Sequence, residues 1–68
     1  MRFSIFLLDT HTYVTNMIWT SPRANEALWF SESGVDDNAL AFPEQTALQL
    51  INRIAEATGR PALLHLKL

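Results

Sequence analysis

The chain has 68 residues, which limits it to one small domain, residues 1–68. Its residues are 49% hydrophobic and 18% charged, a balance that excludes an intrinsically disordered chain and predicts a folded core. There is no cysteine, so disulfide bonds and thiolate metal sites are excluded, and apolar packing or self-association has to stabilise the small core. A homodimer is therefore one of the expectations.

The charge of the chain is small and dispersed. The formal net charge is -2 with neutral histidine, and the five cationic residues form no run: Arg2, Arg23, Arg53, Arg60 and Lys67. Binding to a phosphate backbone depends on clustered Lys and Arg, so direct nucleic-acid binding is not expected. The apolar opening is interrupted by Ser4 and ended by Asp9, and no stretch has the ~20 apolar residues of a membrane span. We therefore expect a cytoplasmic protein without a membrane segment.

The first residues predict a β-hairpin. Arg2 to Leu8 is apolar on both alternating faces, which fits a central strand or a strand whose second face meets a partner. Asp9 to His11 has the composition of a turn. Tyr13 to Thr20 is rich in β-branched and aromatic residues and predicts the second strand. Strict alternation places Tyr13, Thr15, Met17 and Trp19 on one face and Val14, Asn16, Ile18 and Thr20 on the other.

The middle of the chain is less regular. The segment Pro22 to Leu28 fits either a loop or a short helix, because Ser21 followed by proline suits both, and we favour the loop. The aromatic pair Trp29-Phe30 favours an extended chain, which predicts a third strand over Ala27 to Ser31. A polar loop at Ser33-Gly34 to Asn38, to which we assign the carboxylates of Glu32, Asp36 and Asp37, comes next. A short extended piece, Ala39 to Phe42, follows it.

The last third predicts a helix and a closing strand. Pro43 and Glu44 suit the first helical turn, Gly59 suits a left-handed C-terminal cap, and Pro61 prevents continuation of the helix. The predicted buried face of the helix holds Ala47, Leu48, Leu50, Ile51, Ile54, Ala55 and Thr58. In the closing strand Leu64, Leu66 and Leu68 are expected to point inward, and Leu63, His65 and Lys67 outward.

The order of elements is β-β-β-α-β, which predicts an α+β fold: an antiparallel sheet of three to four strands with one helix on one face. One helix cannot cover both faces of such a sheet. The uncovered face is expected to carry aromatic residues, including Trp19 or Trp29, and an exposed apolar face of this kind is typical of an interface.

The sequence contains no catalytic or cofactor motif. Asp9 and His11 lie close in the chain, and Ser4 or Thr12 could be near them, but a solvated turn is the simpler interpretation. His65 is interpreted as a half-exposed strand residue. The carboxylates Glu32, Asp36 and Asp37 lack the spacing of a calcium loop, and a carboxylate at the helix start disfavours a phosphate site. We expect no enzyme activity, no cofactor and no metal.

What remains is recognition of another protein. Aromatic residues are enriched at interface hot spots, and an acidic loop beside an apolar face suits a partner with a basic surface. The candidate contact residues are Trp19, Trp29, Glu32, Asp36 and Asp37. The alternatives are a homodimeric structural or assembly protein and a small nucleic-acid or small-molecule binder.

The second half of the chain also resembles a group of known proteins. The residues that carry the resemblance are Trp29-Phe30, Ala39 to Phe42, Glu44, Ala47, Ile51 and the exit Gly59-Arg60-Pro61. This arrangement is similar to short phage and prophage accessory proteins, among them small α+β anti-CRISPR proteins. The resemblance implies a stoichiometric inhibitor that binds a nucleoprotein defence complex with a basic surface in the host cytoplasm. It assigns no role to any single residue.

Overall fold

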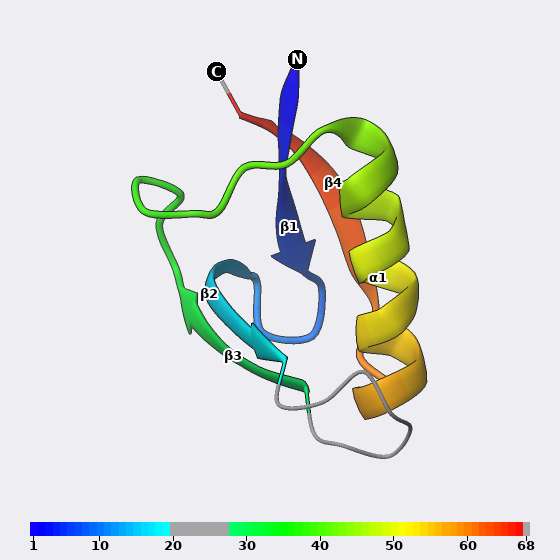
Figure 1. The fold of residues 1–68 in the computed structure, drawn as a ribbon. Helices are drawn as coiled ribbons and strands as arrows, with labels where there is room; N and C mark the ends of the chain where they lie inside the picture. The colour runs from blue at the N-terminus through cyan, green and yellow to red at the C-terminus, as the bar shows by residue number, and fades with distance from the viewer. Residues whose placement is uncertain (20–27, 68) are drawn as a thin grey trace.

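A computed structural model of the chain describes residues 1–19 and 28–67. Four strands and one helix follow one another in the order β1 (Arg2–Leu7), β2 (Thr12–Trp19), β3 (Leu28–Ser33), α1 (Glu44–Thr58) and β4 (Ala62–Lys67) (Figure 1). All strand pairs are antiparallel, and the order across the sheet is β3-β2-β1-β4. The predicted α+β class and the β-β-β-α-β order are confirmed.

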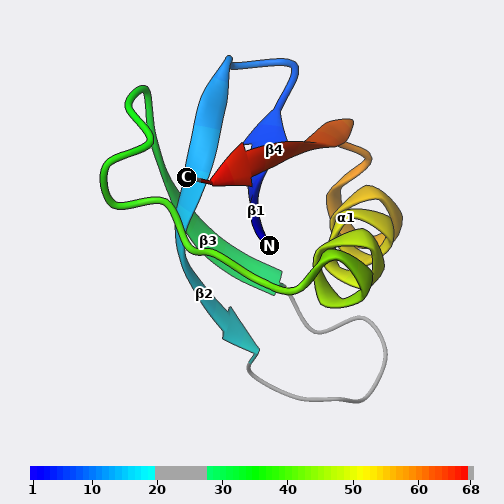
Figure 2. The ribbon, with the colours of Figure 1, turned by 90° about the horizontal axis from the view of Figure 1, so that it is seen from above.

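The helix packs on one face of the sheet, mainly against β1 and β4 (Figures 1 and 2). The fully buried core consists of Ile5, Leu7, Val14 and Ile54. β1 pairs with β2 on one side and with β4 on the other, which confirms the prediction of a central strand from its two-sided apolarity. Because β1 lies in the middle, its residues Ile5 and Leu7 have no exposed surface at all.

The segment before the helix completes the sheet where β1 and β2 separate. These two strands pair only near their hairpin, through Phe6 with Tyr13 and Leu7 with Thr12. Further along, Leu40 donates its N–H to the Val14 carbonyl at 3.0 Å, and Phe42 exchanges two main-chain hydrogen bonds with Phe3 at 2.8 and 2.9 Å. The predicted extended piece Ala39 to Phe42 therefore satisfies main-chain groups that β2 leaves unpaired.

A β-bulge in β2 overturns the predicted division of its two faces. The pairing with β3 shifts register between Val14 and Asn16, and an extra residue in one strand interrupts the alternation of side chains. As a result Val14 and Met17 both reach the core, although strict alternation placed them on opposite faces. The prediction was wrong because a bulge depends on strand pairing, not on the local sequence.

The ends of α1 agree with the prediction. Pro43 precedes the first helical residue, and its carbonyl accepts a hydrogen bond from the Ala47 N–H at 3.0 Å. Gly59 has a left-handed conformation with φ of 73°, and its N–H donates to the Ala55 carbonyl at 2.8 Å. A residue without a Cβ adopts this conformation at the lowest cost.

The buried stripe of α1 is narrower than predicted. Ala47 and Ile54 are buried, and Leu50 and Ile51 pack against the core. The predicted inward residues Leu48, Ala55 and Thr58 are exposed, Leu48 to 46%. A single helix over two strands contacts them along one line, so residues on the flanks of the apolar face remain in solvent.

One strand boundary and one predicted inward residue also differ from the prediction. β3 extends to Ser33, so Glu32 belongs to a strand and not to the following loop. In β4, Leu66 lies on the same face as Leu64, yet it is 41% exposed.

Residues 20–27 and Leu68 lie outside the described residues. Most of the segment Pro22 to Leu28 and the predicted inward position of Leu68 therefore lie outside them too. No helix within 1–19 and 28–67 is long and apolar enough to cross a membrane.

Candidate functional site

The face of the sheet opposite α1 carries a cluster of four aromatic rings and one leucine. We call this cluster the open face: Phe6, His11, Tyr13, Leu63 and His65. Phe6 pairs with Tyr13 across β1 and β2 and with Leu63 across β1 and β4, and cross-strand partners point to the same face. The Phe6 and Tyr13 ring centroids are 5.0 Å apart, and Tyr13 meets His65 edge-on at 5.0 Å. The rings therefore form one continuous patch across β2, β1 and β4.

The hairpin turn adds His11 to this patch. His11 has φ of 56°, a left-handed conformation that few residues other than glycine adopt, although histidine does so more often than most. Its ring stacks on Phe6 at a centroid distance of 5.9 Å and an interplanar angle of 28°. The turn thus presents an exposed imidazole over an aromatic ring, at the cost of some backbone strain.

The loop after β3 supplies the acidic border of the open face. Asp36 Oδ2 lies 3.5 Å from His65 Nε2, with the two side chains 45% and 40% exposed. Lys67 Nζ donates to the Asp36 main-chain carbonyl and lies 3.5 Å from the Asp37 carbonyl. These contacts hold the loop beside β4 and place the Asp36 side chain at the border of the ring cluster.

Ser4 lies on the same face and has the residue types of a catalytic triad near it, but the geometry is not that of a triad. Ser4 pairs with His65 across β1 and β4, and His65 contacts Asp36. The Ser4 side chain is fully buried and its hydroxyl oxygen has no hydrogen-bond partner. A nucleophile has to form a hydrogen bond with its base and be accessible to a substrate, whereas the Ser4 hydroxyl is buried and makes no hydrogen bond with His65. Within the described residues no three His, Asp or Glu side chains converge as metal ligands.

A polar cluster lies on the other face of the sheet, the face on which α1 packs. We call it the Arg60 cluster: Asp9, Thr10, Thr12, Glu32 and Arg60. The Arg60 guanidinium binds Glu32 through two nitrogens at 2.7 and 2.9 Å and Asp9 through two nitrogens at 2.8 and 3.1 Å. Both carboxylates are therefore held in bidentate pairs, the strongest arrangement available to arginine.

The Thr hydroxyls and a ring complete the Arg60 cluster. Thr12 donates to Glu32 Oε1 at 2.6 Å and Thr10 donates to the same oxygen at 3.0 Å. The guanidinium carbon lies 5.4 Å from the centroid of the Phe30 ring, a cation–π contact. The cluster joins the first hairpin, β3 and the segment after α1, and its charged groups bind one another.

The electrostatics of the Arg60 cluster follow from these contacts. The hydrogen bonds from Arg60, then from Thr12, lower the pKa of Glu32 to about 2. The same guanidinium lowers the pKa of Asp9, and the two carboxylates raise the pKa of Arg60. All three groups are thus held in their charged forms, which suits a structural clamp and not a proton-transfer site.

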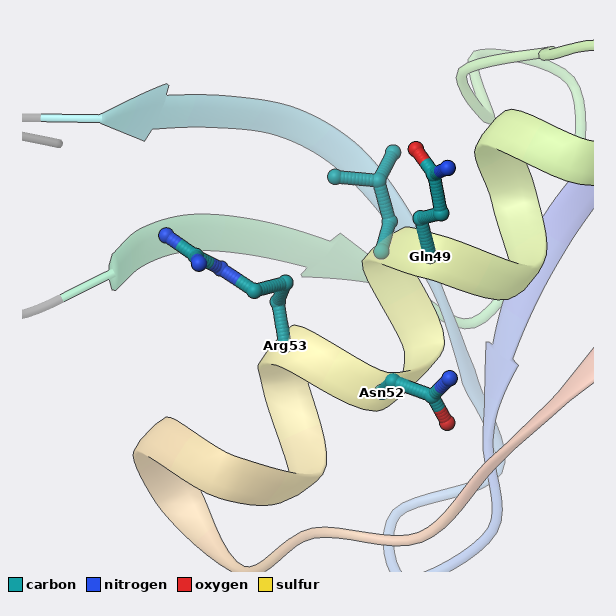
Figure 3. Close-up of a pocket in the computed structure, with 4 residues that line it drawn as sticks. Gln49, Asn52 and Arg53 are labelled. Atoms are coloured by element: carbon teal, nitrogen blue, oxygen red, sulfur yellow. The ribbon is translucent and has the colours of Figure 1, made fainter.

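A hollow of about 410 Å³ lies beside α1 and is lined by Gln49, Leu50, Asn52 and Arg53 (Figure 3). Gln49 and Arg53 project from successive turns of the helix, and Asn52 projects to another side. All four described lining residues come from one stretch of one helix. They do not bring together groups from different elements, so the hollow indicates no ligand chemistry.

The residues predicted to contact a partner are not brought together as one site. The backbones of Trp19 and Trp29 lie in β2 and β3, and the pairing of Ile18 with Trp29 places them on neighbouring strands. Their side chains are outside the described part of the structure. Asp36 and Asp37 lie in the loop as predicted, whereas Glu32 belongs to the Arg60 cluster on the helix side. The role of these residues in partner binding stays a prediction.

The sequence did not single out the rings that form the open face. Tyr13 was assigned to the same face as Met17, and the bulge separates the two. The outward position of His65 and Leu63 in the last strand was predicted correctly, and pairing these two with Phe6 would have located the patch.

Comparison with protein-family models, with curated proteins and with solved structures gives no match.

Proposed function

We propose that this protein is a non-enzymatic protein-binding module and that its contact surface is the open face. The observation that carries the proposal is the continuous ring patch from His11 through Phe6 and Tyr13 to His65 on the sheet face opposite the helix. Tyr and His combine an apolar body with polar atoms, and rings of this kind dominate the energetics of interfaces.

Exposure supports this use of the patch. Leu63 is 53% exposed on the same face, beside the half-buried rings of Phe6 and Tyr13. A large apolar side chain in solvent next to aromatic rings gains free energy when a partner covers it. The rings are already held by contacts with one another, so little side-chain entropy is lost when a partner binds them.

The border of the patch favours a partner of a particular kind. The carboxylate of Asp36 lies beside the His65 ring and Asp37 follows it in the same loop, while Asp9 and Glu32 are both paired with Arg60. The proposed partner is a protein that presents an apolar or aromatic side chain flanked by Lys or Arg. The resemblance to small phage inhibitors extends the proposal to a nucleoprotein defence complex in a host cytoplasm.

Binding assays with paired variants test the proposal. Immobilised wild-type protein and the variants Tyr13→Ala, Leu63→Asp and Gln49→Ala are exposed to lysate of the source organism and of its host. We expect one protein to be retained by the wild type and by Gln49→Ala, which changes only the exposed helix surface, and to be lost with Tyr13→Ala and Leu63→Asp. Thermal unfolding of each variant separates lost binding from lost folding.

The opposite pattern contradicts the proposal. A partner that is retained by both open-face variants and lost with Gln49→Ala would place the contact surface on α1. A mobility shift with oligonucleotides at low salt that disappears as salt is raised would instead support the nucleic-acid alternative.

A further inference from the structure

β4 is an outer strand of the sheet. It is last in the sheet order, and within residues 1–19 and 28–67 it pairs with β1 alone. Leu8 donates its N–H to the Pro61 carbonyl at 3.0 Å, which fixes the carbonyl of residue 61 on the side of β1. Main-chain groups alternate between the two edges of an antiparallel strand. The N–H and carbonyl groups of Ala62, Leu64 and Leu66 therefore point away from the sheet.

This edge lacks the usual protection against pairing. Proteins shield outer strands with proline, inward charges, bulges or short length, and β4 has six residues without an internal proline and with its one charge at the end, Lys67. Two of its leucines are exposed on opposite faces, Leu63 to 53% and Leu66 to 41%. An uncovered edge with exposed leucines on both faces is suited to strand addition.

We infer that a second copy of this chain pairs antiparallel with β4 about a twofold axis at Leu64. This register uses every outward main-chain group, because Ala62 pairs with Leu66 of the second copy and Leu64 pairs with Leu64 of the second copy. On the helix side the small Ala62 lies opposite the exposed Leu66, so a small and a large side chain fit together. On the open side Leu63 lies opposite His65.

The charges of β4 are compatible with self-pairing in this register. Lys67 lies opposite Pro61 of the second copy, so no two like charges meet. The fit of small to large residues and the separation of the charges both come from the sequence of β4 itself, which favours a second copy as the occupant. The two sheets join into one, and the two open faces become neighbours across the axis.

Sedimentation and amide hydrogen exchange of the full chain test the inference. We expect the mass to double across a concentration series, and the amides of Leu64 and Leu66 to become protected in the dimer while those of Leu63 and His65 are protected in both states. Leu66→Lys should weaken dimerisation by about tenfold or more, while Val35→Lys, a matched change at a 59% exposed loop residue, leaves it unaltered.

The register has its own test, because a chain without cysteine can form a disulfide only at an introduced residue. Leu64→Cys should cross-link two copies under mild oxidation, since directly opposed residues in antiparallel strands have Cα atoms about 5.5 Å apart. Val35→Cys should not cross-link two copies.

A monomer with fast-exchanging Leu64 and Leu66 amides at about 1 mM overturns the inference. A dimer in which Leu64→Cys cross-links no faster than Val35→Cys overturns this interface. Leu66 is not part of the open face, so either result leaves the proposed partner binding separately testable.

Discussion

The Arg60 cluster and the open face are both built from polar and aromatic residues. They differ in how many of their groups are bound to another group of the protein and how many are exposed to solvent. In the Arg60 cluster one guanidinium binds two carboxylates, and two hydroxyls donate to one of them. On the open face the rings contact one another while His11 and Leu63 remain exposed. A cluster whose groups bind each other stabilises the fold, whereas a patch with exposed apolar and imidazole groups still has surface for a partner.

The largest expected effect comes from removing the centre of the Arg60 cluster. Arg60→Ala leaves the partly buried Glu32 carboxylate without its bidentate partner and should lower the free energy of unfolding by about 2 to 3 kcal/mol. Urea unfolding at neutral pH measures the change. Arg2→Ala, which removes an exposed arginine from β1, serves as the control and should change stability by less than about 0.5 kcal/mol. Equal losses in the two variants would contradict a structural role of the cluster.

Acid should weaken the same cluster through Glu32. The pKa of Glu32 is lowered from 4.5 to about 2 by Arg60 and Thr12, so its contribution to stability is complete above pH 4.5 and is lost as the pH falls towards 2. We expect about 1 to 2 kcal/mol to be lost in this interval, because the side chain keeps 26% of its surface exposed. Urea unfolding as a function of pH measures it. In Glu32→Gln the loss between these pH values should be smaller, and an unchanged slope would rule out Glu32 as its source.

On the open face, binding should be affected more than stability. Tyr13→Ala removes a half-buried ring that contacts Phe6 and His65, and should cost about 1 kcal/mol of unfolding free energy. The affinity for the partner should fall at least about tenfold, as expected of an interface ring. Urea unfolding and a binding titration, carried out on the same variant, compare the two effects. A variant that loses stability but binds as tightly as the wild type would make Tyr13 a structural residue.

The smallest effect is expected at the border of the open face. His65 Nε2 and Asp36 Oδ2 are 3.5 Å apart and both side chains are well exposed, so the pair resembles a surface salt bridge. Such pairs contribute between about 0 and 1 kcal/mol, and we expect His65→Gln to change the free energy of unfolding by less than about 0.5 kcal/mol. Urea unfolding in low and high salt provides the measurement. A loss comparable to that of Arg60→Ala would show that the two regions do not differ as described.

Features encoded by neighbouring residues were predictable from the sequence. The helix and its ends follow from Pro43, Glu44 and Gly59, whose effects act within one turn. The central position of β1 follows from apolar residues on both faces. The uncovered sheet face follows from counting elements, since one helix cannot cover both faces.

Features that depend on distant residues were not predictable. Arg60 meets Asp9 and Glu32 across 51 and 28 residues of sequence, and no local pattern marks such a meeting. Glu32 was therefore assigned to an acidic loop when it is the main partner of an arginine. The bulge after Val14 likewise depends on how β2 pairs with β3, and it moved Tyr13 away from Met17 and onto the open face.

The ladder between β1 and β4 has a consequence for synthesis of the chain on the ribosome. Arg2 pairs with Lys67 and Leu7 with Ala62, so the first strand of this domain binds its last one, which is synthesised later. Until β4 emerges, one edge of the central strand lacks its partner, and α1 packs on β1 without the second strand that it contacts. A contact pattern of such long sequence range slows folding and postpones completion of the sheet until β4 has been synthesised. Chaperones that bind exposed strands therefore have their longest opportunity in the interval between synthesis of β1 and synthesis of β4.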